Sequence, residues 1–86
     1  MEARILTDLA WLARLQDEPG EALGRAGAAL SVYEDLDFPA GRADALMEAS
    51  LARHEMGARA AAVRGAERAR ELYASVGSPR VRDVEE

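Results

Sequence analysis

ALGRAGAALSVYEDLDFP, residues 22–39, returns forty residues later as AVRGAERARELYASVGSP, residues 62–79. The two stretches share alanines on helical spacing, one tyrosine and one proline, in the pairs Ala22/Ala62, Ala26/Ala66, Ala29/Ala69, Tyr33/Tyr73 and Pro39/Pro79. Upstream of them, Leu6 falls on Leu46 at the same period. A fixed period of about 20–50 residues is the mark of a repeat protein, so we predict two copies of one helical hairpin.

Turn-forming residues divide the chain into four segments. The breaks fall at residues 17–20, 37–39, 56–57 and 77–79, and each contains Gly or Pro. Between them, apolar residues recur at i, i+3, i+4 and i+7, which predicts amphipathic helices over residues 3–16, 20–36, 39–56 and 58–76. Pro39 and Pro79 suit the first turn of a helix, where the missing N–H costs nothing. Short connections make consecutive helices antiparallel neighbours.

Each predicted helix has an apolar stripe that we expect to face the core. The stripe residues are Ile5, Leu6, Leu9, Leu12 and Ala13 in the first helix; Ala22, Leu23, Ala26, Ala29, Leu30, Tyr33 and Leu36 in the second; Ala43, Leu46, Met47, Ser50 and Leu51 in the third; and Ala62, Val63, Ala66, Ala69, Leu72, Tyr73 and Val76 in the fourth. Gly24, Gly27 and Gly65 interrupt these helices. Each costs about 1 kcal/mol relative to Ala, and we expect close helix packing to be the reason for them.

The composition excludes several classes of protein. The 86 residues form one domain, rich in Ala and poor in β-branched residues, which favours helices throughout. There is no Cys, so neither a disulfide framework nor a zinc–thiolate site is available, and we expect a cytoplasmic location. The sequence has no run of about 18 apolar residues, so we predict no membrane span.

The ionisable residues form no recognisable catalytic or metal-binding motif. His54 is the single histidine, and no second histidine follows at the spacing of a zinc protease, so we predict a surface histidine near a helix C-terminus. The acidic clusters at residues 17–18 and 34–37 lie at predicted helix ends, where carboxylates are solvated, and lack the spacing of a calcium loop. No Gly-rich phosphate loop and no nucleophile–base pair is present. We therefore predict no enzymatic activity, no metal and no cofactor.

The fourth predicted helix has a basic stripe whose members are Arg59, Arg64, Arg68 and Arg70. Glu67 and Glu71 alternate with these arginines, which is typical of a salt-bridged solvent face. The net charge of −5 also argues against nucleic acid as a partner. The chain has no Lys and no Asn, which favours a GC-rich, bacterial coding sequence over dedicated guanidinium recognition.

The pattern of small and large residues in both copies resembles the tetratricopeptide repeat. The matching positions are Leu6, Leu9, Ala10, Ala22 and Ala26 in the first copy, and Leu46, Ala49, Ser50, Ala62 and Ala66 in the second. The sequence departs from that family in its period of forty rather than about thirty-four residues, and in having Ala at most of the usual aromatic positions. In this it is similar to the long-repeat arrays of bacterial signalling ATPases and regulators.

The resemblance implies an all-α fold in which antiparallel helical hairpins stack as a short right-handed solenoid. A single domain over residues 1–86 would contain repeat one at 1–38, repeat two at 39–78 and the start of a third at 79–86. Solenoids need about three repeats, because each repeat leaves an apolar face for its neighbour. We therefore expect either a piece of a longer array or a chain that self-associates, with a dimer as the expected form.

In the tetratricopeptide family the first helix of each repeat lines a concave groove that binds partners. Carried across by position, the groove would contain Arg4, Thr7, Trp11, Arg14 and Leu15 from the first copy, and Asp44, Met47, Leu51, His54 and Glu55 from the second. Trp, Arg and Met are enriched at interfaces and their hot spots, so Trp11 is the main candidate. The alternative is that Trp11 fills a gap against the third helix.

These expectations together predict a protein-interaction or assembly module. Its concave face would bind a peptide, a helix or another copy of the chain, through burial of Trp11, Met47 and Leu51. The alternative function is that of a sensor-array fragment from a bacterial transcriptional regulator or signalling ATPase. Repeat folds serve many purposes, so the partner itself does not follow from the resemblance.

Overall fold

Four α-helices make up the computed structural model, which describes residues 2–75. They are α1 (Glu2–Leu15), α2 (Pro19–Leu36), α3 (Pro39–Glu55) and α4 (Arg59–Ser75). There is no strand within residues 2–75, so the predicted all-α class is confirmed, and the helix ends from Leu15 to Arg59 lie within one residue of their predictions. The expected start of a third repeat at residues 79–86, with Pro79, lies outside the described residues, as does Val76.

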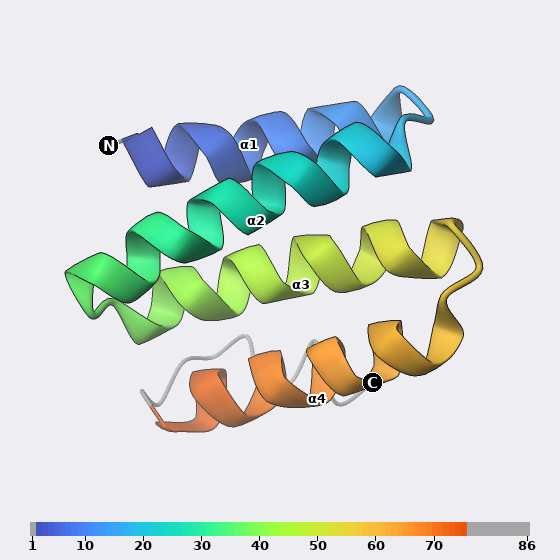
Figure 1. Ribbon diagram of the computed structural model, residues 1–86. Helices are drawn as coiled ribbons and strands as arrows, with labels where there is room; N and C mark the ends of the chain where they lie inside the picture. Colours follow the sequence, from blue (N-terminus) through green and yellow to red (C-terminus); the bar gives the residue numbers. More distant parts are fainter. Residues whose placement is uncertain (1, 76–86) are drawn as a thin grey trace.

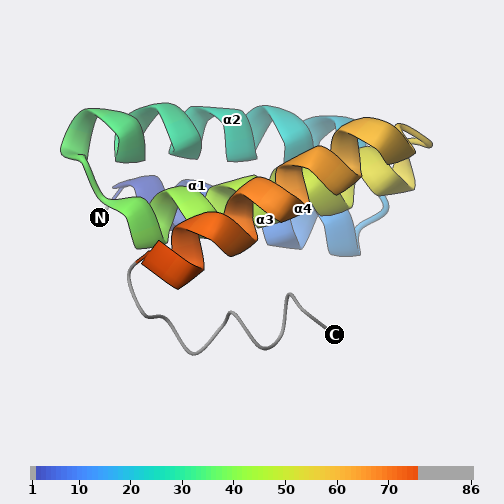
Figure 2. The same ribbon diagram turned by 90° about the horizontal axis from the view of Figure 1, so that it is seen from below.

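Each helix packs against the next one in the chain, and α1 also contacts α3. Figure 1 shows the four helices side by side in chain order and running in alternate directions. Figure 2 shows α2 in a separate layer from α1 and α3. The prediction that consecutive helices are antiparallel neighbours is therefore confirmed. As a consequence, α1 and α3 run in the same direction and share a face on the side away from α2.

The three connections between the helices have one geometry and recur every twenty residues. Their central residues, Asp17, Asp37 and Gly57, have left-handed backbone with φ of 62°, 52° and 85°. In each turn the following backbone N–H donates to the carbonyl five residues earlier, over 2.9, 3.1 and 2.8 Å. This Schellman arrangement satisfies carbonyls that a helix end leaves free. α2 and α3 then begin at Pro19 and Pro39, so the predicted break at 17–20 was too long.

Alanines build the core where α1, α2 and α3 meet. Three clusters each contain a buried alanine from every one of these helices: Ala13/Ala22/Ala52, Ala10/Ala26/Ala49 and, together with Tyr33, Ala3/Ala29/Ala45. Small side chains let the helix backbones approach closely, so the alanine content sets the close spacing of the helices. A fourth cluster joins α3 to α4 through Ala43, Ala69, Leu72 and Tyr73.

Several large residues of the predicted core stripes are exposed instead. Their exposed fractions are 58, 43, 58 and 58% for Ile5, Leu12, Leu36 and Val63. Conversely, α3 buries three alanines that its predicted stripe omits: Ala45, Ala49 and Ala52. The reason is that a stripe inferred along one helix assumes one neighbour, whereas α3 packs against α2, α4 and α1. The outer side of α1 has no such second neighbour among the described helices.

The glycines inside the helices do not all serve close packing. A Cβ at Gly65 would overlap the Ser50 hydroxyl, so the prediction of close packing holds for Gly65. A Cβ at Gly41, in α3, would likewise overlap the ring of Tyr33. Gly24 and Gly27 have no described atom within 4 Å of the place where a Cβ would lie, and the prediction is wrong for these two.

Candidate functional site

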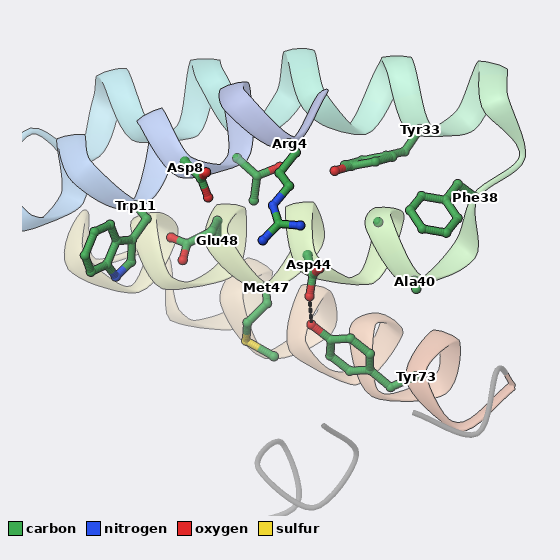
Figure 3. A pocket seen from close by; sticks show the side chains of 12 residues that line it. Arg4, Asp8, Trp11, Tyr33, Phe38, Ala40, Asp44, Met47, Glu48 and Tyr73 are labelled. Carbon is green, nitrogen blue, oxygen red and sulfur yellow. Dashed lines mark hydrogen bonds between the residues drawn. The ribbon is translucent and has the colours of Figure 1, made fainter. Parts of the chain in front are cut away.

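A hollow opens on the face that α1 and α3 share, and it extends to the C-terminal end of α2 and to α4 (Figure 3). Its volume is about 650 Å³, which lies in the range of sites that take a small ligand or a few side chains of a peptide. We name it the aromatic hollow and define it by its lining residues, which are Arg4, Thr7, Asp8, Trp11, Tyr33, Phe38, Ala40, Gly41, Asp44, Met47, Glu48 and Tyr73.

All four aromatic residues of the chain line this hollow. Tyr33 and Tyr73 are only 4% and 2% exposed and form its floor, whereas Trp11 and Phe38 are 49% and 45% exposed and form its rim. The rest of the core is mainly alanine. Large aromatic side chains gathered at one surface hollow are typical of a site that binds another polypeptide, because Trp and Tyr are enriched at interface hot spots.

Backbone features near the end of α2 place Tyr33 and Phe38 in the hollow. The left-handed Asp37 turns the chain so that Phe38 lies over Tyr33, with ring centroids 5.6 Å apart. An apolar contact between these two positions commonly accompanies a Schellman turn. Gly41, at the start of α3, leaves the space that the Tyr33 ring occupies. The turn and the glycine together bring two aromatic rings to the edge of the shared face.

Four charged side chains surround the aromatic floor. The Tyr73 hydroxyl donates a hydrogen bond of 2.5 Å to Asp44 Oδ1 and so ties α4 to α3 across the hollow (Figure 3). Arg4 and Asp8 enter from α1, and Glu48 enters from α3. The lining thus has three carboxylates and one guanidinium. Glu48 pairs with Arg14 and Asp44 accepts the Tyr73 hydroxyl, so two of these carboxylates already have partners within the chain.

An ion-pair cluster links α1 to α3 beside the hollow. Arg14 Nε lies 3.1 Å from Glu48 Oε2, and Arg14 Nη1 lies 3.6 Å from Glu55 Oε2. The side chains of Arg14 and Glu48 are only 20% and 14% exposed, so water screens this pair less than a fully exposed one. The cluster holds the two helices that form the shared face in a fixed register.

The aromatic hollow contains half of the residues predicted for a concave face. These are Arg4, Thr7, Trp11, Asp44 and Met47. Trp11 lines the hollow and is 49% exposed, so about half of its surface is covered by neighbouring residues. Thr7 donates its hydroxyl to the Ala3 carbonyl at 2.9 Å. The geometry brings these five side chains together, and their role in binding stays a prediction.

The other five predicted residues lie outside the lining of the hollow. Arg14 and Glu55 form the ion-pair cluster, so their charges already have partners within the chain. Leu15 and His54 are exposed in the last turns of α1 and α3. Leu51 is partly buried in α3. A partner that reached them would have to extend along the shared face beyond Trp11.

Sequence reasoning did not identify several side chains that line the hollow: Asp8, Tyr33, Phe38, Glu48 and Tyr73. Both tyrosines belong to the predicted core stripes and are indeed buried, but spacing along one helix does not reveal that their rings reach a hollow. The signal that was available is the recurrence of Tyr at the same position of two alanine-rich helices. The position of Phe38 depends on the left-handed backbone at Asp37. Such a turn is harder to predict at Asp than at Gly, because Gly is the residue that usually adopts this conformation.

The remaining titratable groups of residues 2–75 do not form a second site. No group of three His, Cys, Asp or Glu side chains among these residues could hold a metal ion. On α4, Arg68 and Glu71 form one exposed ion pair of the predicted solvent face, at 3.9 Å. Before α2, Glu21 raises the pKa of the exposed Glu18 above its ordinary value, through a shared hydrogen bond and through charge repulsion. This is a crowded helix N-terminus and not a pocket.

No helix within the described part of the chain is both long and apolar enough to cross a membrane. Comparison of the chain with protein-family models, with curated proteins and with solved structures finds no match. The function is therefore inferred from the aromatic hollow and from the repeated architecture.

Proposed function

We propose that the protein is an interaction module that binds a segment of a polypeptide in the aromatic hollow. The observation that carries this proposal is that all four aromatic side chains of an alanine-rich chain line one hollow. Two of them, Trp11 and Phe38, keep about half of their surface exposed at its rim. A bound segment would bury these rings, and the burial of large aromatic surfaces is the main source of binding energy at interfaces.

The module is built, in this proposal, from two tetratricopeptide-like hairpins. The forty-residue period of the sequence and the common geometry of the three turns support it. So does the position of α1 beside α3 in one layer, with α2 in another (Figure 2). In such an architecture the first helices of successive repeats line the partner-binding face, which is where the aromatic hollow lies.

The charges of the hollow indicate what kind of segment it takes. Asp8 and Asp44 line the hollow together with the aromatic rings, and Arg4 is the one basic side chain of the lining (Figure 3). We expect a segment with a large apolar side chain for the space between Trp11 and Met47, next to a Lys or Arg that faces Asp8. Electrostatic complementarity of this kind selects partners and speeds their association.

Peptide selection tests the proposal, since the chain's single tryptophan lies in the hollow. Peptides displayed on phage are selected on the full chain, and the enriched peptides are titrated while the fluorescence of Trp11 is followed. We expect peptides with adjacent basic and apolar residues, and a blue shift of the emission on binding. Trp11→Ala, which lacks the fluorophore, is compared with wild type by isothermal titration calorimetry. It should weaken binding about tenfold or more, because truncation of an interface hot spot costs about 2 kcal/mol.

Leu15→Ala is the matched control, because Leu15 is exposed on the same helix but does not line the hollow. It should leave peptide affinity unchanged. Circular dichroism should show full helicity for both variants, since neither side chain is part of the buried core. Peptides that bind wild type and Trp11→Ala equally well would contradict the proposal.

A further inference from the structure

The C-terminal end of α4 lies at the aromatic hollow. Tyr73 belongs to the floor of the hollow and donates its hydroxyl to Asp44, and α4 ends two residues later, at Ser75. Because α4 runs antiparallel to α3, this end is beside the first turn of α3, where Ala40 and Gly41 line the same hollow (Figure 1). The chain therefore continues after Ser75 from one end of the site of the proposed function.

Residues 76–86, with the sequence VGSPRVRDVEE, are long enough to follow the hollow from this end. The hollow runs along α1 from Arg4 to Trp11, and this stretch of helix rises about 10 Å. Five residues of extended chain span about 17 Å. Residues 80–84 are therefore sufficient to cover the hollow, while residues 76–79 connect them to α4.

The C-terminal residues are a poor match to the packing that a third repeat would require. The forty-residue period places Val81 at the position of Gly41 and Glu85 at the position of Ala45. A Cβ at Gly41 would overlap the Tyr33 ring, and Ala45 is 0% exposed in a cluster with the same tyrosine. Against the equivalent tyrosine of the second copy, a valine would clash and a carboxylate would lose its hydration. The chemistry of these residues therefore favours another contact.

The aromatic hollow has one charged side chain of each sign that forms no ion pair with a described residue. These are Arg4 and Asp8. Residues 80–84, RVRDV, supply both signs together with two apolar side chains. A basic residue next to an apolar one is the combination that we expect the hollow to bind. Charge complementarity and apolar content therefore select this segment of the chain as an occupant.

We propose that residues 80–84 occupy the aromatic hollow of their own molecule and compete there with partner segments. Arg82 faces Asp8, and Val84 covers the exposed part of the Trp11 ring. This contact rests on the proposed function, since both require a hollow that binds polypeptide, and it adds a regulator of that site. The segment needs little affinity of its own, because a short tether gives it an effective concentration of about 1 mM.

The segment is displaced by partners that fill the hollow better. Valine is smaller than the apolar side chain that we expect from a partner between Trp11 and Met47, so it buries less surface there. An effective concentration about ten times the segment's own Kd keeps the hollow occupied about nine-tenths of the time, and the apparent affinity for a partner is then about tenfold lower. The segment thus sets a threshold that favours partners with larger apolar side chains.

The fluorescence of Trp11 tests the contact in the full chain, before any peptide is added. Val84→Asp should release the segment, shift the emission to longer wavelength and increase quenching by acrylamide. It should also raise the affinity for the selected peptides about tenfold. Val63→Asp is the matched control, because Val63 is 58% exposed on α4 and does not line the hollow. It should change neither the emission nor the affinity, and circular dichroism should show equal helicity for both variants.

An exchange of charges tests the position of the segment in the hollow. Arg82→Asp and Asp8→Arg should each shift the Trp11 emission to longer wavelength, because each brings like charges together. The double variant Asp8→Arg/Arg82→Asp restores opposite charges and should return the emission to that of the wild type. A double variant that is no closer to wild type than the single variants would overturn the placement of the segment.

Equal emission and equal peptide affinity of wild type and Val84→Asp would overturn the proposal. A wild-type emission that moves to longer wavelength on dilution would overturn the contact within one chain in favour of the same segment from a second copy. The proposed function fails separately, if neither wild type nor Val84→Asp binds the selected peptides. The emission and the charge exchange then still decide whether the segment lies in the hollow.

Discussion

α1 and α3 hold equivalent positions in the two copies of the repeat, yet only α3 lies between neighbours on both sides (Figure 1). At three equivalent positions α3 has the buried residues Ala45, Ala49 and Ala52, whereas α1 has the larger and more exposed Ile5, Leu9 and Leu12. The difference shows that residue size in this protein follows helix spacing. At the three positions where α3 packs on α2 the residues are alanines, and at the equivalent positions of α1, where no described helix follows, they are larger.

The largest change in stability is expected when residues at equivalent positions of α1 and α3 are exchanged. Ala52→Leu places a large side chain at a position that is 0% exposed, and we expect it to destabilise the fold by about 3 kcal/mol. The reverse change at the equivalent position, Leu12→Ala, should cost about 1 kcal/mol or less, since Leu12 is already 43% exposed. Urea unfolding followed by circular dichroism at low protein concentration measures both. Equal losses would show that the two helices are covered alike.

Gly41 lies where α3 contacts Tyr33 of the preceding hairpin, which is a second close approach of α3. A Cβ there would overlap the Tyr33 ring, so Gly41→Ala should destabilise the protein by about 2 kcal/mol in spite of alanine's better helix propensity. Gly24→Ala, on an open face of α2, is the control and should stabilise the protein by about 1 kcal/mol. Thermal unfolding of both variants distinguishes them by sign. A gain for both would refute the close contact of Gly41 with Tyr33.

The three turns that connect the helices differ in the residue that adopts the left-handed conformation. The first two turns have Asp17 and Asp37 in left-handed backbone, and the third has Gly57. Asp37→Gly should stabilise the protein by about 0.5 kcal/mol, because glycine adopts this conformation without steric cost. Gly57→Ala should cost about 1 kcal/mol for the converse reason. Denaturant midpoints report both, and a loss of stability in Asp37→Gly would mean that the aspartate side chain stabilises the turn.

The smallest expected effect concerns the residue that precedes α2. Glu21 raises the pKa of Glu18 in the folded protein, so the folded state holds this proton more tightly than the unfolded chain does. The resulting stability is present below the ordinary pKa of glutamate and is lost as the pH rises through the raised value. Glu18→Gln should therefore raise the melting temperature slightly at neutral pH and leave it unchanged in acid. A shift of equal size at both pH values would exclude repulsion as the cause.

The helices were predictable because the signals that define them are local. Helical spacing, the prolines at the helix starts and the breaks between segments all lie within a few residues of the boundaries that they mark. Part of the shared face was also anticipated, since the concave face implied by the resemblance to tetratricopeptide repeats included Arg4 and Trp11 of α1 and Asp44 and Met47 of α3, which line one hollow. Residues in register on two parallel helices reach one surface whatever the details of packing.

Contacts between residues that are far apart in the sequence could not be predicted from such local signals. Tyr33 reaches the hollow because Gly41 leaves space for its ring. Tyr73 reaches it because Asp44 accepts the hydrogen bond of its hydroxyl. Arg14 forms an ion pair with Glu48 of the same chain, although it was predicted to contact a binding partner. The apolar stripes misjudged which leucines are buried for the same reason, since the sides of a helix that are covered depend on its neighbours.

The amino-acid sequence on its own therefore determined the helices, their boundaries and the repeat, because hydrogen bonds between residues four apart and apolar periodicity act along the chain. Only the tertiary structure decided the aromatic hollow, the ion-pair cluster and the bare stripe of α1. Each of these depends on how closely two helices approach, and that distance is set by side chains that meet from different parts of the chain.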